Sequence, residues 1–357
     1  MGVYYMNCNE LRGIYLHITE ACEYHCDFCY ASFGLGNFGH ADYENIKKIA
    51  LCAAKAGVKK ISLIGGNPAL HPQIAEILRF IHSSTEMEVV LMTNTAYFPN
   101  NTIKDLAPYI NIVMVTIHGD NSTLHDKITT VDGSYENLLS ACKEFQRYSV
   151  PIEVAYNITP CTYNQIFSSL EALINKGINV KRYVLQRIAP IIDMNGNIQK
   201  SNEEYIPNKK QVNIALSQIM EAKRVYNIPI ELVDPFPLCI VDDQYRQLIT
   251  PCKCGLTDLS INGKGDVSRC GADPNYQLGN VLLSQSDNPI LDLWQNSPNL
   301  LQFRERKYLP DNCQTCKDKW ICGGGCEVSC NIFKKYDINH LDIFNREFYE
   351  DKAQLPV

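Results

Sequence analysis

The sequence has 357 residues, of which 45% are hydrophobic and 20% are charged, so its length predicts about two domains of ordinary globular composition. The formal net charge of −6 argues against a large nucleic-acid surface, which needs clustered Lys and Arg. No apolar run reaches the roughly 18 residues of a membrane span, and residues 1–6 lack a signal-peptide pattern, so we expect a cytoplasmic protein with no membrane partner.

Short apolar runs alternate with amphipathic stretches from residue 12 to about residue 232. The runs predict strands at residues 13–18, 60–64, 88–92, 112–117, 152–158 and 180–188, with a short seventh at 228–232. Helical spacing predicts helices at residues 42–56, 72–83, 102–109, 134–147, 163–175 and 208–226. Repeated strand–helix units give parallel strands, so the fold class is α/β. The number of units favours a partial (β/α)6 TIM-like barrel over a flat doubly wound sheet, with the active site at the carboxyl ends of the strands.

Proline and glycine break the chain into turns after about residue 235. Residues 313–330 hold five cysteines and three consecutive glycines. A region with so few regular elements needs another source of stability, and bound metal can supply it. We therefore expect two domains, a barrel at residues 1–235 and a cysteine-rich domain at residues 236–357.

Sixteen cysteines are the unusual feature of the composition. Three of them form a CxxxCxxC motif directly after the first strand: Cys22, Cys26 and Cys29. Three thiolates can hold three irons of a [4Fe–4S] cube and leave the fourth iron open to a small molecule. Zinc is the alternative, with His17 or His25 as the fourth ligand.

The position of this motif after the first strand, together with the aromatic Phe28, resembles the radical S-adenosylmethionine (SAM) superfamily. The resemblance implies that Cys22, Cys26 and Cys29 hold a [4Fe–4S] cluster that transfers one electron to SAM. The products are methionine and a 5′-deoxyadenosyl radical, which abstracts hydrogen from the substrate. The backbone of Phe28 would contact the adenine.

The segment Gly65-Gly66-Asn67-Pro68 resembles the Gly-Gly-Glu-Pro segment of this family, which lies against the methionine end of SAM. Asn67 stands where the family has Glu. Glycine suits a place where the backbone must approach a ligand closely. The resemblance further implies cofactor contacts from polar residues near the ends of later strands, namely Thr116, Asn157, Gln186 and Arg187.

The C-terminal cysteines resemble the SPASM extension of the superfamily, which carries two auxiliary [4Fe–4S] clusters. The resemblance assigns Cys254, Cys270 and Cys326 to the first, with Cys252 or Cys239 as its fourth ligand. It assigns Cys313, Cys316, Cys322 and Cys330 to the second. A pair of zinc sites is the alternative.

These features predict a maturase that oxidises or crosslinks a ribosomally synthesised peptide, by thioether or carbon–carbon bond formation. The expected partners are a precursor peptide and an electron donor such as flavodoxin or ferredoxin. Because the barrel starts almost at once and leaves no room for an N-terminal leader-binding domain, either the barrel recognises the peptide directly or a separate peptide-presenting protein delivers it. Gly271 replaces an Asp of the sulfatase-maturing branch and argues against formylglycine formation. The alternatives are a radical enzyme acting on a sugar, amino sugar or nucleoside, and a non-catalytic zinc scaffold. No general base is identified.

Overall fold

The structure is a computed structural model that describes residues 10–26, 28–29, 39–95, 102–188, 204–272 and 277–328. Its main sheet contains seven parallel strands that neighbour one another in chain order. They are β1 (Gly13–Thr19), β2 (Lys60–Gly65), β3 (Glu88–Thr93), β4 (Ile112–Ile117), β5 (Ile152–Ile158), β6 (Val180–Arg187) and β7 (Ile230–Leu232). The six predicted strands and the short seventh are confirmed.

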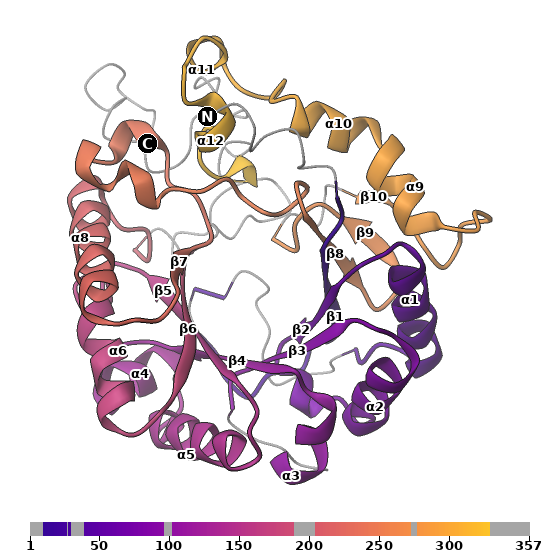
Figure 1. Cartoon of the computed structure of the whole chain (residues 1–357), viewed down its shortest axis with the longest axis horizontal. Helices are drawn as coiled ribbons and strands as arrows, with labels where there is room; N and C mark the ends of the chain where they lie inside the picture. The colour runs from indigo at the N-terminus through magenta and orange to yellow at the C-terminus, as the bar shows by residue number, and fades with distance from the viewer. Residues whose placement is uncertain are drawn as a thin grey trace.

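Helices surround the curved sheet on its outer side (Figure 1). They are α1 (Tyr43–Lys55), α2 (Ile74–Ser84), α3 (Ile103–Leu106), α4 (Ser122–Thr129), α5 (Ser134–Arg147), α6 (Ile166–Asn175) and α8 (Lys209–Val225). The helix predicted at residues 102–109 is α3 followed by a 3₁₀ turn at Ala107–Tyr109, because Pro108 interrupts the α-helical pattern. The partial TIM-like barrel is thus confirmed. The sequence analysis missed α4, a short helix capped by Asn121.

Apolar side chains fill both sides of the barrel sheet. Those on the outer side, such as Val89 and Leu91, join the large core beneath the helices. Those on the inner side form a separate buried cluster: Val90, Ile112, Met114, Ala155 and Val184. The alternation follows from the two-residue period of a strand, and the barrel is packed rather than hollow at this level.

The C-terminal region continues the barrel sheet. It contributes β8 (Asp258–Asn262), β9 (Asp266–Ser268) and β10 (Gln277–Asn280), and then α9 (Pro289–Asn296), α10 (Pro298–Arg304), α11 (Asp311–Gln314) and α12 (Lys319–Cys322). Strand β8 pairs in parallel with β1, from Gly13 opposite Asp258 to His17 opposite Asn262, and β9 pairs antiparallel with β8. The sheet is therefore continuous across residue 236, where the sequence analysis divides the chain.

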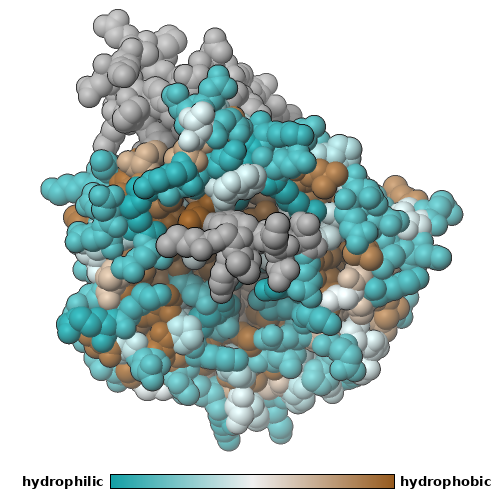
Figure 2. All heavy atoms as spheres, turned by 45° about the horizontal axis from the view of Figure 1, so that its top comes forward, coloured by the Kyte–Doolittle hydropathy of each residue, from teal (hydrophilic) through white to brown (hydrophobic). Residues whose placement is uncertain are grey.

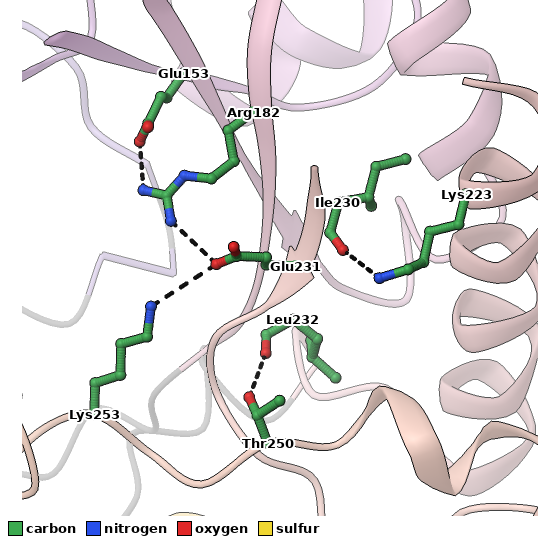
Figure 3. Close-up of polar contacts among 8 residues, drawn as sticks. All are labelled: Glu153, Arg182, Lys223, Ile230, Glu231, Leu232, Thr250 and Lys253. Carbon is green, nitrogen blue, oxygen red and sulfur yellow. Dashed lines mark hydrogen bonds and ion pairs between the residues drawn. The ribbon is translucent and has the colours of Figure 1, made fainter. Parts of the chain in front are cut away.

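Charged side chains from three barrel strands meet inside the sheet (Figure 3). Arg182 on β6 forms ion pairs with Glu153 on β5 and Glu231 on β7. Lys253 reaches the same Glu231 carboxylate at 3.8 Å. Two cations therefore balance two carboxylates: Arg182 and Glu153 are largely buried, whereas Glu231 and Lys253 are partly exposed to solvent. Because Lys253 lies between Cys252 and Cys254, this network also joins the barrel interior to the cysteine-rich region.

Hydrophilic side chains cover most of the face in Figure 2, with hydrophobic ones interspersed among them. The large apolar residues that are exposed come from separate elements: Leu51, Val225, Leu283, Leu301 and Trp320. Within the described ranges, no helix combines the length and the hydropathy that a bilayer crossing requires.

Candidate active site

The CxxxCxxC loop begins where β1 ends, at the carboxyl edge of the barrel sheet. The hydroxyl of Thr19 accepts a hydrogen bond from the Ala21 backbone, and the Cys29 amide donates to the Cys26 carbonyl at 2.9 Å. The His25 amide donates to Thr129 at the end of α4. The loop is thus held between β1 and α4 at the barrel mouth, which is the position that the sequence analysis expected.

Asn94, which follows β3, supports the first cysteine of the loop. Its side-chain amide donates to Cys22 Sγ at 3.6 Å and to the Glu23 carboxylate at 3.3 Å. Burial raises the pKa of Cys22 to about 11, and the charges of Glu23 and Cys29 add to this rise. A thiolate here therefore requires a compensating positive charge, which bound iron supplies. Sequence reasoning missed Asn94 because a single Asn after a strand carries no distinctive spacing.

Asn67 is fully buried and its side chain is engaged on every side. Its amide donates to both oxygens of Glu23 at 3.1 Å, and its carbonyl oxygen accepts from the Thr93 hydroxyl and the Ala69 amide. Burial raises the pKa of Glu23. The carboxylate beside position 67 thus comes from Glu23 in the cysteine loop, and the Asn67 side chain orients it.

Gly65 and Gly66 lie against the backbone that leads into the cysteine loop. A Cβ at Gly65 would stand 2.2 Å from the Thr19 carbonyl oxygen, and one at Gly66 would stand 2.0 Å from the Ala21 carbonyl oxygen. The Gly66 amide donates to Thr19, and the Asn67 amide donates to Ala21. Both glycines are therefore needed for close packing of β2 against the loop. The sequence analysis gave a different reason, the approach of a ligand.

Phe28 packs into the barrel mouth. Its ring makes edge contacts with His118, at 5.3 Å between centroids, and with Tyr205, at 5.6 Å. His118 follows β4 and its backbone amide donates to Nδ1 of His125 in α4. Burial lowers the pKa of both histidines, so both are neutral near pH 7. The loop carrying the cysteines is thereby anchored through its aromatic residue.

Three of the predicted cofactor-contacting residues lie on the inner side of the barrel. Thr116, Asn157 and Gln186 are half-buried near the carboxyl ends of β4, β5 and β6, and Asn157 is the register partner of Gln186. Arg187 lies on the opposite face of β6, where its guanidinium donates to the Pro235 carbonyl at 3.1 Å. The structure therefore brings three of these residues together and separates Arg187 from them.

A cavity of about 490 Å³ opens beside this end of β1 and β8. Its walls include His17, Thr19, His40, Ser260 and Gly271. His17 Nε2 lies 3.1 Å from the Ser260 hydroxyl, and a Cβ at Gly271 would stand only 2.8 Å from the same ring nitrogen. An Asp side chain therefore has no room at position 271 without a shift of His17.

The first C-terminal cysteine group lies beside the middle of β1, since Cys252 and Cys254 are electrostatic neighbours of Tyr15 and Gly271, next to Cys270, lies against the His17 ring. The Cys254 thiol is hydrogen-bonded to Cys252 and Cys270, contacts that raise its pKa. Arg269, next to Cys270, forms a buried ion pair with Glu327 at 2.8 Å. The pair fixes the segment that contains Cys326 against the other three cysteines.

The second C-terminal group contains Cys313 on α11, Cys322 on α12 and Cys316 in the turn between these helices. The three glycines after α12, residues 323–325, all have positive φ and form a tight turn before Cys326. Cys330, expected in this group, lies outside the described residues. Cys239 lies close to the group instead, since its charge is among those that raise the pKa of Cys313.

Single-ion sites are absent from the parts of the chain that the structure describes. No three His, Cys, Asp or Glu side chains there converge as the ligands of one metal ion.

Two family models match the sequence. The radical SAM superfamily model covers residues 16–162, and the SPASM model, described as an iron–sulfur cluster-binding domain, covers residues 252–317. Together they include the CxxxCxxC loop and the cysteines from Cys252 to Cys316.

Relatives and solved structures agree with this assignment. A PqqA peptide cyclase of Rhizobium meliloti is 22% identical over 87% of this chain and 80% of its own length. An AdoMet-dependent heme synthase of Methanosarcina barkeri is also 22% identical, over 88% of this chain and 91% of its own. Streptococcus suis SuiB bound to S-adenosylmethionine has a TM-score of 0.73 at 16% identity, covering 94% of this chain and 76% of SuiB, and so shares the fold. The chain belongs to the radical SAM superfamily, as an enzyme of the SPASM type that uses S-adenosylmethionine and [4Fe–4S] clusters.

Proposed function

We propose that this enzyme modifies a ribosomally synthesised peptide by radical chemistry, forming a thioether, a carbon–carbon crosslink or a related oxidised product. The observation that carries the proposal is the presence of three separate cysteine groups on one barrel scaffold. The similarity to PqqA peptide cyclases over most of both chains supports it. So does the likeness in fold to SuiB, which has been solved with its precursor peptide SuiA, at a TM-score of 0.68.

In this proposal Cys22, Cys26 and Cys29 hold the cluster at the barrel mouth. When bound there, the cluster and SAM supply the 5′-deoxyadenosyl radical. Asn67 orients Glu23, whose carboxylate complements the amino group of SAM. Phe28 anchors the loop and presents its backbone to the adenine.

The remaining SAM contacts are assigned to main-chain and strand-end groups. The segment from Gly65 to Pro68 borders the methionine end. Thr116, Asn157 and Gln186 offer hydrogen-bonding side chains on the inner side of the barrel. Arg187 acts on the site indirectly, by holding the Pro235 segment against β6.

Two auxiliary clusters complete the proposal. Cys252, Cys254, Cys270 and Cys326 hold the first, and the charge of Arg269 stabilises their thiolates. Cys313, Cys316 and Cys322 provide three ligands of the second. The first group lies beside the middle of β1, near Tyr15 and His17, and the radical cluster lies beyond the carboxyl end of the same strand. This placement suits the removal of an electron from a substrate bound at the barrel mouth.

The domain division at residues 235 and 236 belongs to the same proposal, with the barrel as the radical-generating part and residues 236–357 as the auxiliary part. An electron donor such as flavodoxin or ferredoxin reduces the radical cluster. A separate peptide-presenting protein delivers the precursor.

The decisive experiment uses anaerobically reconstituted enzyme with short peptides encoded beside its gene. We expect about twelve irons per chain, at four per cube, together with release of 5′-deoxyadenosine and a mass change in one peptide. A Cys22→Ala variant should lose 5′-deoxyadenosine, and a Cys161→Ala variant, at an exposed position, should retain it. About eight irons and turnover of a sugar or nucleoside would instead select the small-molecule alternative. Zinc in place of iron would refute both.

A further inference from the structure

The short 3₁₀ turn Leu238–Ile240 lies against the second auxiliary cysteine group, although the two are far apart in the sequence. The Leu238 backbone amide donates to Cys322 Sγ at 3.3 Å. Backbone amides that donate to sulfur in this way are a common feature around cluster thiolates, because they stabilise the negative charge. The turn therefore meets α12 at the sulfur atom itself.

A second contact fixes the same turn from its carbonyl side. Arg246 donates to the Leu238 carbonyl at 3.2 Å, and its other terminal nitrogen pairs with the Asp318 carboxylate. The Asp318 carbonyl in turn accepts from the Cys322 amide at 2.9 Å. Leu238 is thus held to α12 through both its amide and its carbonyl.

Cys239 follows in this turn and is the fourth thiol of the neighbourhood. It lies close enough to Cys313 for the two thiols to interact electrostatically, and Cys322 and Cys316 are the other such neighbours of Cys313. Three sulfurs from residues 313–322 and one from the 3₁₀ turn are therefore gathered in one place, as the four ligands of a cube must be.

We propose that Cys239 is the fourth ligand of the second auxiliary cluster, with Cys313, Cys316 and Cys322. This inference rests on the proposed function, since it presumes that the cluster forms. A [4Fe–4S] cube takes four thiolates, so Cys330 is not required for it. The sequence analysis placed Cys239 as a candidate for the first cluster, but Cys252 already adjoins Cys254 there.

The test compares Cys239→Ala with Cys330→Ala, and Cys161→Ala serves as the control at another exposed cysteine. Iron, sulfide and Mössbauer spectra are measured on each anaerobically reconstituted full chain. We expect Cys239→Ala to lose one cube, about four irons, and the other two variants to match the wild type. The inference is overturned if Cys330→Ala loses the cluster or if Cys239→Ala keeps it. A wild type without auxiliary clusters would refute the proposed function instead.

Cysteine labelling answers the same question on unaltered protein, should the Cys239→Ala chain unfold. Iodoacetamide is applied to the loaded wild type and to protein stripped of iron, and the labelled peptides are identified by mass. Although both side chains are exposed, we expect Cys161 to be labelled in both samples and Cys239 only after stripping. Labelling of Cys239 in the fully loaded enzyme would exclude it as a ligand.

Discussion

Arg182 lies inside the barrel between the carboxylates of Glu153 and Glu231. Replacement by Met would leave Glu153, which is 4% exposed, without its cation. Loss of one partner of such a pair costs about 3–5 kcal/mol of unfolding free energy. We expect a loss near the lower value from Arg182→Met in denaturant titrations, because the Arg182 side chain retains some contact with water. Arg224→Met, which breaks an exposed pair with Glu221, should leave stability almost unchanged.

Gly66 packs too closely against the cysteine loop to accept a side chain. In Gly66→Ala, the new Cβ would meet the Ala21 carbonyl oxygen at 2.0 Å, so the loop bearing Cys22 must move. We expect less iron at the radical cluster and a fall in 5′-deoxyadenosine release of about 100-fold, since small displacements of reacting groups have effects of that size. Gly39→Ala, where the nearest atom would lie at 3.6 Å, is the matched control. Normal iron content in Gly66→Ala would contradict this account.

His125 links stability to pH. Burial lowers its pKa to about 4, an effect that Asp126 partly offsets, whereas an unfolded His titrates near 6.5. The contribution of neutral His125 to the free energy of unfolding is complete above about pH 6.5 and is lost as the pH falls toward 4. The reason is that His125 takes up its proton at a higher pH in the unfolded state than in the folded state. We expect the wild type to lose about 2 kcal/mol from this group between pH 7 and pH 5.

The matched variant is His125→Asn, which cannot titrate but keeps an acceptor for the His118 amide. Its unfolding free energy, measured by denaturant titration at each pH, should fall less steeply than that of the wild type. Parallel pH profiles for the two proteins would assign the acid sensitivity to other groups.

At the scale of elements, β8 links the barrel to the auxiliary region, since it pairs with β1 on one side and β9 on the other. Ile261→Pro would remove a strand hydrogen bond at the centre of this pairing and cost about 1–3 kcal/mol. Because β1 leads into the cysteine loop, iron at the radical cluster should fall as well. Ile261→Val, at about 0.5–1.5 kcal/mol, should keep its iron. Thermal unfolding and iron analysis check both expectations.

The barrel elements could be predicted from sequence because their strands are continuous apolar runs buried on both sides. Strand β8 could not be predicted, because Asp258, Ser260 and Asn262 place polar residues on one of its faces. Its sequence therefore resembles that of a loop. The short helix α4 offers two turns only, too few for a clear apolar period.

The cysteine loop could be located from its spacing alone, because its three ligands are neighbours in the chain. Glu23 and Asn94 could not, because their roles depend on contacts with Asn67 and Cys22 that come from other elements. The position of Cys239 was likewise hidden, since only the fold brings its neighbour Leu238 to Cys322 and Cys239 itself close to Cys313.

At the scale of the whole molecule, the barrel depends on the C-terminal strands. A chain ending at residue 250 would expose the edge of β1 now covered by β8, and an open apolar edge promotes aggregation. We expect this chain to be insoluble on expression. The full-length Cys313→Ser/Cys316→Ser double variant, which keeps all the strands, should stay soluble. If the shortened chain were soluble and monomeric, the strands would be dispensable.

The ion pairs of Arg182 and the apolar cluster around Val90 and Met114 have a consequence for how a substrate can enter and leave the barrel. Together they occupy the inner side of β3 to β7 towards the amino-terminal ends of these strands, where Arg182 and Glu153 are largely shielded from water. We therefore expect the reactive residue of a peptide to reach the barrel interior from the carboxyl ends of the strands, as a terminus or a bend, and to leave in the same direction.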